Sequence, residues 1–379
     1  MRFLILLSLS CLFLTSCKDE KKNTPPNQEV VSTPENIKYA KGFSITNYKN
    51  YTEIIVTSPW PGSQDAFRYL LVDNDEDIPE FRESTVIIKR PITKVVAMST
   101  TNIPALEYLN VEDRLVGFPS TKFISSEKTR ALIDKGHIKD LNNDLEINME
   151  LFLELQPDLV IAFSVNGINK SLNQIEKFGY PVVLDGSWTE EHPLGRAEWI
   201  KFMGALFNKQ DEANAIFESI EADYLEAKKL AMEVNEKPVI ISGSMFNDVW
   251  NMPGGKSYIA KYFEDANTNY IWKDDLSNGS IHLNFENVLE RGREADLWIG
   301  AGSFYNLEDM KKSHKGYTYF DAYKNKNIYS YTKKTGPKGG ILYYELGPLR
   351  PDLILKDIIN ISHPYLLKDY ENYFYKRLD

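Results

Sequence analysis

The chain has 379 residues, a formal net charge of −10 and two cysteines. Both cysteines lie within the first 17 residues, which excludes a disulfide framework, a thiolate metal site or a cysteine nucleophile in the rest of the chain. The chain has 54 acidic and 44 basic side chains, and this acidic excess argues against a broad nucleic-acid surface. The length predicts two domains.

Residues 1–16 are typical of an export signal. Arg2 precedes a largely apolar run over residues 3–14, which is shorter than the roughly 20 residues that a membrane-spanning helix needs. The segment ends in Leu14-Thr15-Ser16-Cys17, which resembles the bacterial lipobox, so Cys11 is expected to be removed and Cys17 to carry a lipid anchor. An ordinary signal peptide with a chance cysteine is the alternative. We predict an exported protein, anchored by lipid in the cell envelope on the periplasmic side of a membrane, with the polar residues 17–35 as a flexible tether.

Residues 36–92 are expected to form a β extension ahead of the main body. Segments rich in β-branched and aromatic residues predict strands at 52–57, 69–72 and 85–88. The run Ser58-Pro59-Trp60-Pro61-Gly62 between the first two strands has the composition of a turn. The sequence assigns this extension no function.

From residue 93 the pattern changes to short apolar strands that alternate with helices, which is typical of a parallel sheet covered on both faces. One α/β lobe is predicted over residues 93–191, with strands at 95–98, 115–118, 159–162 and 181–184. A second lobe is predicted over residues 237–379, with strands at 239–241, 297–299 and 328–329. Apolar residues at three- and four-residue steps predict one long helical connector over residues 192–236, with a break near Asn208-Lys209 as the alternative.

The two lobes share a repeated detail around a pair of glutamates. Asn148-Met149-Glu150 and Asn284-Phe285-Glu286 each open a predicted helix that leads into a buried strand. Asn is a good N-cap residue, and a glutamate in the first turn stabilises the helix dipole by about 0.3–1 kcal/mol, which is sufficient to explain either copy alone. The repetition favours a second interpretation, in which Glu150 and Glu286 are exposed carboxylates that meet paired arginines on a partner.

These pieces together resemble the substrate-binding proteins of ABC importers for ferric siderophores, haem and cobalamin. The resemblance runs from about Lys94 to Asp379. It also includes Gln156-Pro157-Asp158-Leu159-Val160-Ile161, Asn287-Val288-Leu289, Ala295-Asp296-Leu297, Pro253-Gly254-Gly255-Lys256-Ser257, Arg350-Pro351-Asp352-Leu353 and His363-Pro364. It implies an α/β fold of two Rossmann-like lobes joined by one long α-helix, here with the N-terminal β extension added.

The resemblance also implies a function. The protein would be a monomeric binding protein without a cofactor of its own, which captures an iron chelate of the ferric-siderophore type between the lobes. It would deliver this ligand to an inner-membrane ABC permease–ATPase complex, onto which Glu150 and Glu286 would dock. Cobalamin or haem is the alternative ligand.

Ligands of parallel α/β sheets bind beyond the C-terminal strand ends, where two facing lobes form a cleft. Large aromatic side chains near these ends are suited to the apolar faces of a bulky chelate, and basic side chains to its carboxylate or catecholate groups. Packing in the core is the alternative for the aromatic residues, and a solvated loop is the alternative for the lysine. The predicted ligand-binding residues are Trp188, Met245, Trp250, Phe304, Tyr305, Lys338 and Arg350, with Arg196 as a weaker candidate.

Three other functions fit the sequence less well. A zinc- or manganese-binding protein would need histidines and carboxylates converging on an ion, but the five histidines show no close spacing, so no metal site is predicted. Dinucleotide, P-loop, nucleophile-elbow and zinc-protease motifs are absent, so we do not expect an enzyme. A surface lipoprotein that captures a ligand without an ABC partner is the third alternative.

Overall fold

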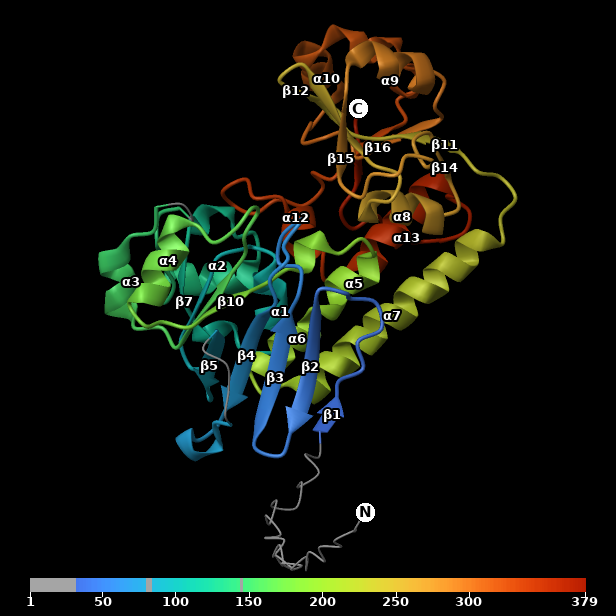
Figure 1. Cartoon of the computed structure of the whole chain (residues 1–379). Coiled ribbons are helices and arrows are strands. Elements are labelled where there is room, and N and C mark those ends of the chain that lie inside the picture. Colours follow the sequence, from blue (N-terminus) through green and yellow to red (C-terminus); the bar gives the residue numbers. More distant parts are fainter. Residues whose placement is uncertain (1–31, 80–83, 144–145) are drawn as a thin grey trace, which may run out of the picture. The chain divides into compact units, whose positions relative to one another are not determined.

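The computed structural model describes residues 32–79, 84–143 and 146–379. The predicted signal segment, the predicted lipidation site Cys17 and most of the predicted tether lie outside these residues. The described part of the chain contains an N-terminal sheet, two α/β lobes and a helical connector (Figure 1). None of the helices described in these ranges combines the length and the apolar character that a membrane span requires.

The N-terminal sheet has five strands in the order β1-β2-β3-β4-β5, and all neighbours are antiparallel except β4 and β5. The strands are β1 (Ser32–Pro34), β2 (Phe43–Tyr48), β3 (Tyr51–Val56), β4 (Phe67–Val72) and β5 (Thr85–Lys89). Alternate residues of β3, including Ile54 and Val56, are buried, so one face of the sheet packs on the rest of the protein. The β extension is confirmed. The tether prediction is wrong for its last residues, because residues 32–34 pair with β2.

Lobe one has an all-parallel sheet in the order β10-β9-β6-β7-β8. Its strands are β6 (Val95–Ala97), β7 (Leu115–Phe118), β8 (Lys139–Asp140), β9 (Leu159–Ala162) and β10 (Val182–Leu184). Alternate residues of β9 pack into two separate apolar clusters, one on each face of the sheet, which explains the continuous apolar runs in the sequence. The helices are α1 (Asn102–Tyr108), α2 (Glu127–Asp134), α3 (Met149–Leu155) and α4 (Lys170–Lys177).

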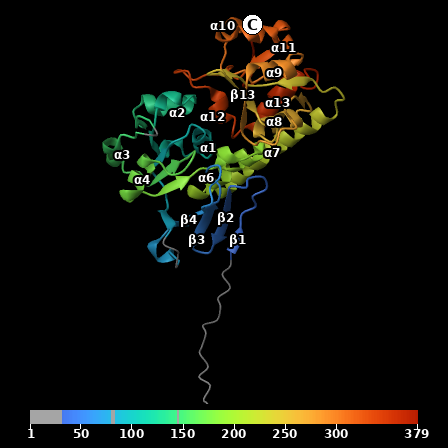
Figure 2. The same cartoon turned by 45° about the horizontal axis from the view of Figure 1, so that its top comes forward.

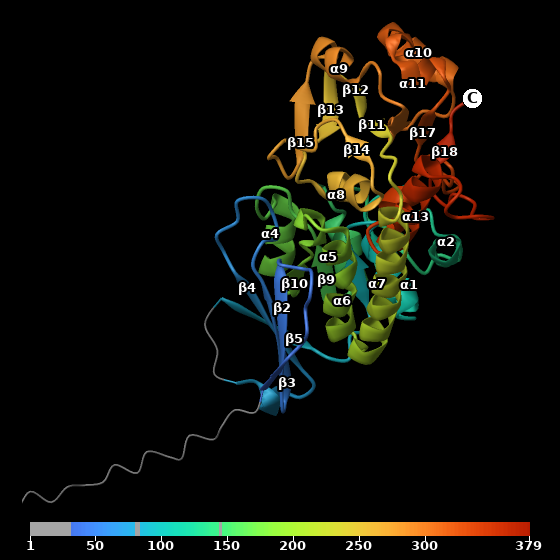
Figure 3. The same cartoon turned by 90° about the vertical axis from the view of Figure 1, so that its right-hand side faces the viewer.

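The connector consists of the long helix α7 (Gln210–Met232) preceded by two short helices, α5 (Pro193–Glu198) and α6 (Ile200–Leu206). The break near Asn208-Lys209, which was the alternative to one continuous helix, is present, because Asn208 has a φ of +57°, which an α-helix cannot contain. At about 1.5 Å per residue, the 23 residues of α7 span about 34 Å. Figure 2 shows α6 and α7 between the two lobes, and Figure 3 shows the N-terminal sheet beside α6.

Lobe two has a five-stranded sheet in the order β14-β11-β16-β17-β18, parallel except for β18. Its strands are β11 (Val239–Ile241), β14 (Asn269–Tyr270), β16 (Leu297–Ile299), β17 (Ile328–Ser330) and β18 (Lys376–Arg377). A small antiparallel sheet, which the sequence did not predict, contains β12 (Ser244–Phe246), β13 (Val249–Pro253) and β15 (Ser280–Leu283). The helices are α8 (Tyr258–Asp265), α9 (Phe285–Gly292), α10 (Leu307–Ser313), α11 (Asp321–Lys324), α12 (Leu342–Leu346) and α13 (Pro351–Ser362).

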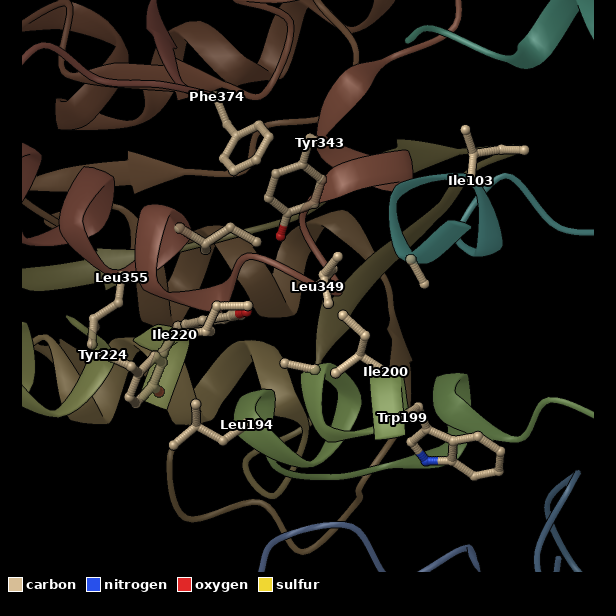
Figure 4. Close-up of a cluster of buried hydrophobic side chains, with 14 of the residues drawn as sticks. Ile103, Leu194, Trp199, Ile200, Ile220, Tyr224, Tyr343, Leu349, Leu355 and Phe374 are labelled. Carbon is tan, nitrogen blue, oxygen red and sulfur yellow. The ribbon is translucent and has the colours of Figure 1, made fainter. Parts of the chain in front are cut away.

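The lobes and the connector share one hydrophobic core. Ile103 of lobe one, Ile200 and Tyr224 of the connector, and Leu355 of lobe two belong to the same cluster of buried side chains. Figure 4 shows these residues converging from the three parts of the protein. The two α/β lobes are therefore packed together and not only linked by a helix.

Candidate functional site

A cavity of about 770 Å³ lies where strand ends of the two lobes meet. Trp188 lines it just after β10 of lobe one, and Gly243, Gly300 and Tyr331 line it just after β11, β16 and β17 of lobe two. The cavity therefore occupies the C-terminal edges of both parallel sheets, where ligands of such sheets bind. Its volume falls within the range of roughly 300–1,000 Å³ that is typical of small-molecule sites.

Aromatic side chains make up much of the cavity wall. Tyr331 stacks on Tyr343 with ring centroids 5.0 Å apart, and Tyr344 meets Tyr331 edge-on at 5.1 Å. Tyr344 is 49% exposed, whereas Tyr343 is buried. The wall therefore offers aromatic surface to a ligand. The aromatic lining residues are Trp60, Trp188, Tyr258, Tyr331, Tyr343, Tyr344 and Tyr375.

The two glutamates of the cavity wall have partners within the protein. Glu190 is almost completely buried, and its carboxylate accepts hydrogen bonds from the backbone N–H groups of Lys41 and Gly42, each at 2.9 Å. Glu191 accepts a hydrogen bond of 2.8 Å from the amide of Asn278, which lies on the opposite side of the cavity in lobe two. Both carboxylates are therefore held in place by neutral N–H donors of the protein.

The two basic residues of the wall differ in their surroundings. Arg196 donates to the backbone oxygens of Trp188 and Glu190, and its guanidinium carbon lies 3.5 Å from the centre of the Tyr258 ring, in a cation–π contact between the connector and lobe two. Lys41 is exposed, and no hydrogen bond or ion pair within the described ranges engages its Nζ atom. Lys41 is therefore a free cation at the edge of the cavity.

A second cavity of about 530 Å³ shares Lys41, Glu190, Glu191 and Ser257 with the first one, so the two are neighbours. Lys261 lines this second cavity but is paired with Glu264 and Asp265 at 2.7 and 3.0 Å. Lys41 thus lines both of two adjacent cavities.

Of the predicted ligand-binding residues, Trp188 lines the cavity, as does the weaker candidate Arg196. The prediction for Trp250 is wrong, because its side chain is fully buried and its indole donates to the backbone oxygen of Ser242 at 2.9 Å. Trp250 also stacks on Trp298 with ring centroids 5.1 Å apart, so it belongs to the core of lobe two.

Four further predicted residues lie outside the cavity lining. Met245 and Phe304 are half-buried, and both lie close to Tyr317, which accepts a hydrogen bond from the Met245 backbone and faces the Phe304 ring. Tyr305 and Lys338 are exposed to solvent. The structure therefore does not bring these four side chains to the same site as Trp188.

Arg350, predicted to bind the ligand, instead joins the two lobes. Its guanidinium forms a two-bond contact with the buried carboxylate of Asp352, at 2.8 and 2.6 Å, and donates to the hydroxyl of Tyr108 in lobe one at 2.9 Å. The hydrogen bond with Asp352 raises the pKa of Arg350. The arginine is thus held by the protein and lies outside the lining.

Glu345 of α12 forms a second contact between the lobes. Its buried carboxylate accepts hydrogen bonds from the backbone N–H groups of Ser125 and Ser126, at 2.6 and 2.9 Å, where α2 of lobe one begins. Burial raises the pKa of the Glu345 carboxyl to about 7, with a smaller contribution from Glu107.

Glu150 and Glu286 lie in the first turns of α3 and α9, one on each lobe, and both are exposed. Asn148 and Asn284 cap these helices as expected, accepting from the N–H groups of Leu151 and Asn287. Within the described ranges neither glutamate forms an ion pair. Both carboxylates are accordingly accessible to a partner.

Sequence reasoning missed Trp60 and most of the tyrosines of the wall. Trp60 was assigned to a turn. It lines the same cavity as Trp188, which is more than 120 residues away in the sequence. Tyr343 and Tyr344 form an adjacent aromatic pair after Gly339-Gly340, which is the local signal that could have found them. Within the residues that the structure describes, no three side chains of the His, Cys, Asp or Glu type converge in a way that could hold a metal ion.

The fold agrees with the comparisons to known proteins. The model of the family described as periplasmic binding protein matches residues 95–335, so the chain belongs to this family. The family is one of solute-binding proteins rather than enzymes.

Individual relatives are similar over different parts of the chain. An uncharacterized lipoprotein of Methanocaldococcus jannaschii is 26% identical and the match covers 99% of this chain and 96% of the relative. A vitamin B12-binding protein of Vibrio parahaemolyticus is 24% identical over 48% of this chain and 67% of its own. The crystal structure of a periplasmic binding protein from Veillonella parvula superposes with a TM-score of 0.57 at 17% identity, covering 83% of this chain and 92% of that one. This structural likeness supports the two-lobed α/β fold.

Proposed function

We propose that the protein captures an iron chelate of the ferric-siderophore type in the cavity between its lobes and delivers it to an ABC permease. The observation that carries this proposal is the combination of an aromatic wall with the unpaired cation of Lys41. Aromatic faces suit the planar groups of a chelate, and a free cation suits carboxylate or catecholate oxygens that remain charged. Because such a ligand brings its own iron, the protein needs no metal ligands of its own.

Cobalamin is the second candidate ligand, because a relative is a vitamin B12-binding protein. The two candidates differ in charge more than in size. A ferric catecholate is strongly anionic, whereas the corrin ring is bulky and largely uncharged at its rim. Lys41 therefore favours the chelate, and a direct comparison of the two ligands decides between them.

A binding titration tests the proposal. Quenching of tryptophan fluorescence should accompany binding of ferric siderophores, since Trp60 and Trp188 line the cavity. Tyr344→Ala should weaken binding by about tenfold or more, because it removes an exposed ring from the wall. Tyr319→Ala, at an exposed ring outside the cavity lining, is the matched control and should bind normally. If the protein binds cobalamin but no ferric siderophore, the second candidate ligand replaces the first.

Delivery to the permease is proposed to involve Glu150 and Glu286. The double variant Glu150→Ala/Glu286→Ala should keep ligand affinity and lose uptake into cells, because two exposed carboxylates can pair with arginines of a permease. Glu154→Ala/Glu290→Ala is the matched control, since these exposed glutamates lie on the same two helices about one turn later. Normal uptake by the first variant would contradict the docking role.

Membrane attachment is proposed to rest on lipidation of Cys17. The related lipoprotein of Methanocaldococcus jannaschii, whose match extends over nearly the whole chain, supports this assignment. Cys17→Ala should release the protein from membranes into the soluble fraction, which cell fractionation measures.

A further inference from the structure

The N-terminal sheet reaches the ligand cavity. Residues 41–42, before β2, and 58–63, in the loop between β3 and β4, contribute seven of the 27 lining residues. Lobe one and the start of the connector together contribute only five. Figure 1 shows the loop between β3 and β4 extending toward α12, which carries Tyr343 and Tyr344. The sheet is thus a structural part of the cavity.

Two buried glutamates, one at the end of lobe one and one in the connector, hold the chain just before β2. Glu198 is fully buried, and its carboxylate accepts hydrogen bonds from the backbone N–H groups of Lys38, Tyr39 and Ala40, at 2.8, 2.7 and 2.9 Å. Glu190 continues this series at Lys41, as described above. Charge-assisted hydrogen bonds of this kind are short and strong, so the position of residues 38–42 relative to the connector is closely defined.

The loop between β3 and β4 also contacts lobe one. Ser58 accepts a hydrogen bond of 3.0 Å from the hydroxyl of Thr189, and Thr57 donates to the Gly42 oxygen at 2.8 Å. Gly186 allows the close approach, because a Cβ atom there would lie 3.0 Å from the Ser58 oxygen and 3.1 Å from the Cα atom of Pro59. The loop therefore presents Trp60 to the cavity from a fixed base.

The side chains that this sheet brings to the cavity have a definite chemical character. Trp60 is half-buried, with its ring edge-on to Phe67 at 5.5 Å, so the indole has a support behind it. Lys41 is exposed and has a free ammonium group. A supported aromatic face next to an unpaired cation matches a ligand with planar aromatic groups and charged oxygens.

We propose that the N-terminal sheet is a third wall of the binding site, in which Lys41 and Trp60 select an anionic aromatic chelate such as a ferric catecholate. This inference rests on the proposed function, because it assumes that the cavity binds an iron chelate. It assigns a role to the segment before residue 93, which the matched family model does not include.

Two substitutions and their matched controls test the third wall in the full chain. The probe is the iron(III) complex of 2,3-dihydroxybenzoate, and cyanocobalamin is the uncharged comparison. Lys41→Gln should weaken binding of the ferric complex by about tenfold and reduce the dependence of affinity on salt, because it removes one screened charge pair. Trp60→Leu should weaken binding by at least about fivefold, and Trp60→Phe should restore most of it.

The controls lie at the opposite end of the same sheet, at the last residue of β2 and in the turn between β2 and β3. Lys49→Gln and Tyr48→Leu make the same changes in charge and ring content but lie outside both cavities, so they should bind the ferric complex normally. Thermal melting of each ligand-free variant checks that the fold is intact. If Trp60→Leu has a lowered melting temperature, Lys41→Gln still tests the inference, because the Lys41 side chain is exposed.

The outcomes separate this inference from the proposed function. Suppose that Lys41→Gln and Trp60→Leu bind the ferric complex like the wild type, while Tyr344→Ala binds it more weakly. The cavity then binds the chelate, and the inference of a third wall is wrong. If the wild type binds no ferric complex, the proposed function fails and the inference fails with it. An equal loss in the Lys49→Gln control would also overturn the inference, because the effect would then reflect general surface charge.

Discussion

Ionisation of Glu345 should destabilise the folded protein as the pH rises, and Glu345→Gln should remove this effect. Burial raises the pKa of the Glu345 carboxyl to about 7, from an ordinary value of 4.5. The folded state therefore binds a proton more tightly than the unfolded state does. Between these two pKa values the unfolded state holds fewer protons, so the free energy of unfolding falls as the pH increases. The loss is complete about one pH unit above the raised pKa, near pH 8.

The size of the effect follows from the difference between the two pKa values. One pKa unit corresponds to about 1.4 kcal/mol, so the difference between 4.5 and about 7 corresponds to a total loss of about 3.4 kcal/mol in the free energy of unfolding. About 2.5 kcal/mol of this loss falls between about pH 5 and pH 8. Glutamine does not titrate in this range. Over the same interval, the free energy of unfolding of the wild type should therefore fall by about 2.5 kcal/mol relative to that of Glu345→Gln.

Urea unfolding followed by circular dichroism at several pH values measures this difference. Other buried carboxyls, such as those of Asp185 and Asp357, titrate in both proteins and cancel in the comparison. Any constant cost of placing an amide opposite the Ser125 and Ser126 N–H groups shifts the whole curve and leaves its slope unchanged. A stability difference that stays constant with pH, or that grows in favour of the wild type at high pH, would refute the reasoning.

Further expectations concern the core and the attachment of the N-terminal sheet. Trp250→Ala should lower the free energy of unfolding by about 3–5 kcal/mol, because it empties a fully buried site, while Trp250→Phe should leave ligand affinity unchanged in a binding titration. Gly186→Val should displace the loop between β3 and β4 and weaken ligand binding, since its Cβ atom would lie about 3 Å from the loop backbone. Glu198→Gln should destabilise the protein by about 3 kcal/mol in urea unfolding, because it leaves the buried ammonium of Lys201 without its ion pair. The control Glu226→Gln, on the exposed face of α7, should have little effect.

The periodic elements of this fold could be predicted from the sequence because their signals are local. The apolar runs at 159–162 and 297–299 each form a buried parallel strand, and Asn148 and Asn284 cap the helices that precede them. The small sheet of β12, β13 and β15 was not predicted. Its strands are short, few of their residues are buried, and β15 joins the β12–β13 hairpin by pairing with a segment about 30 residues away.

The binding site was less predictable because its residues are defined by tertiary contacts. Trp250 and Trp188 both lie near strand ends and look alike in sequence, yet one packs on Trp298 in the core and the other faces the cavity. Arg350 carries a charge suitable for a ligand, but Asp352 two residues later already neutralises it. Trp60 enters the site only because the sheet that carries it docks on the connector, a contact that no local pattern encodes.

The shared core limits the ways in which this cavity can choose its ligand. Residues of lobe one, the connector and lobe two pack in one cluster beneath the cavity, and Glu345 and Arg350 add polar contacts between the lobes. A wide separation of the lobes would expose this apolar surface, at a cost of roughly 25 cal/mol for each Å², and would break both contacts. The distance between the walls is therefore nearly fixed. In a cavity of fixed width, selectivity comes from the chemistry of the walls.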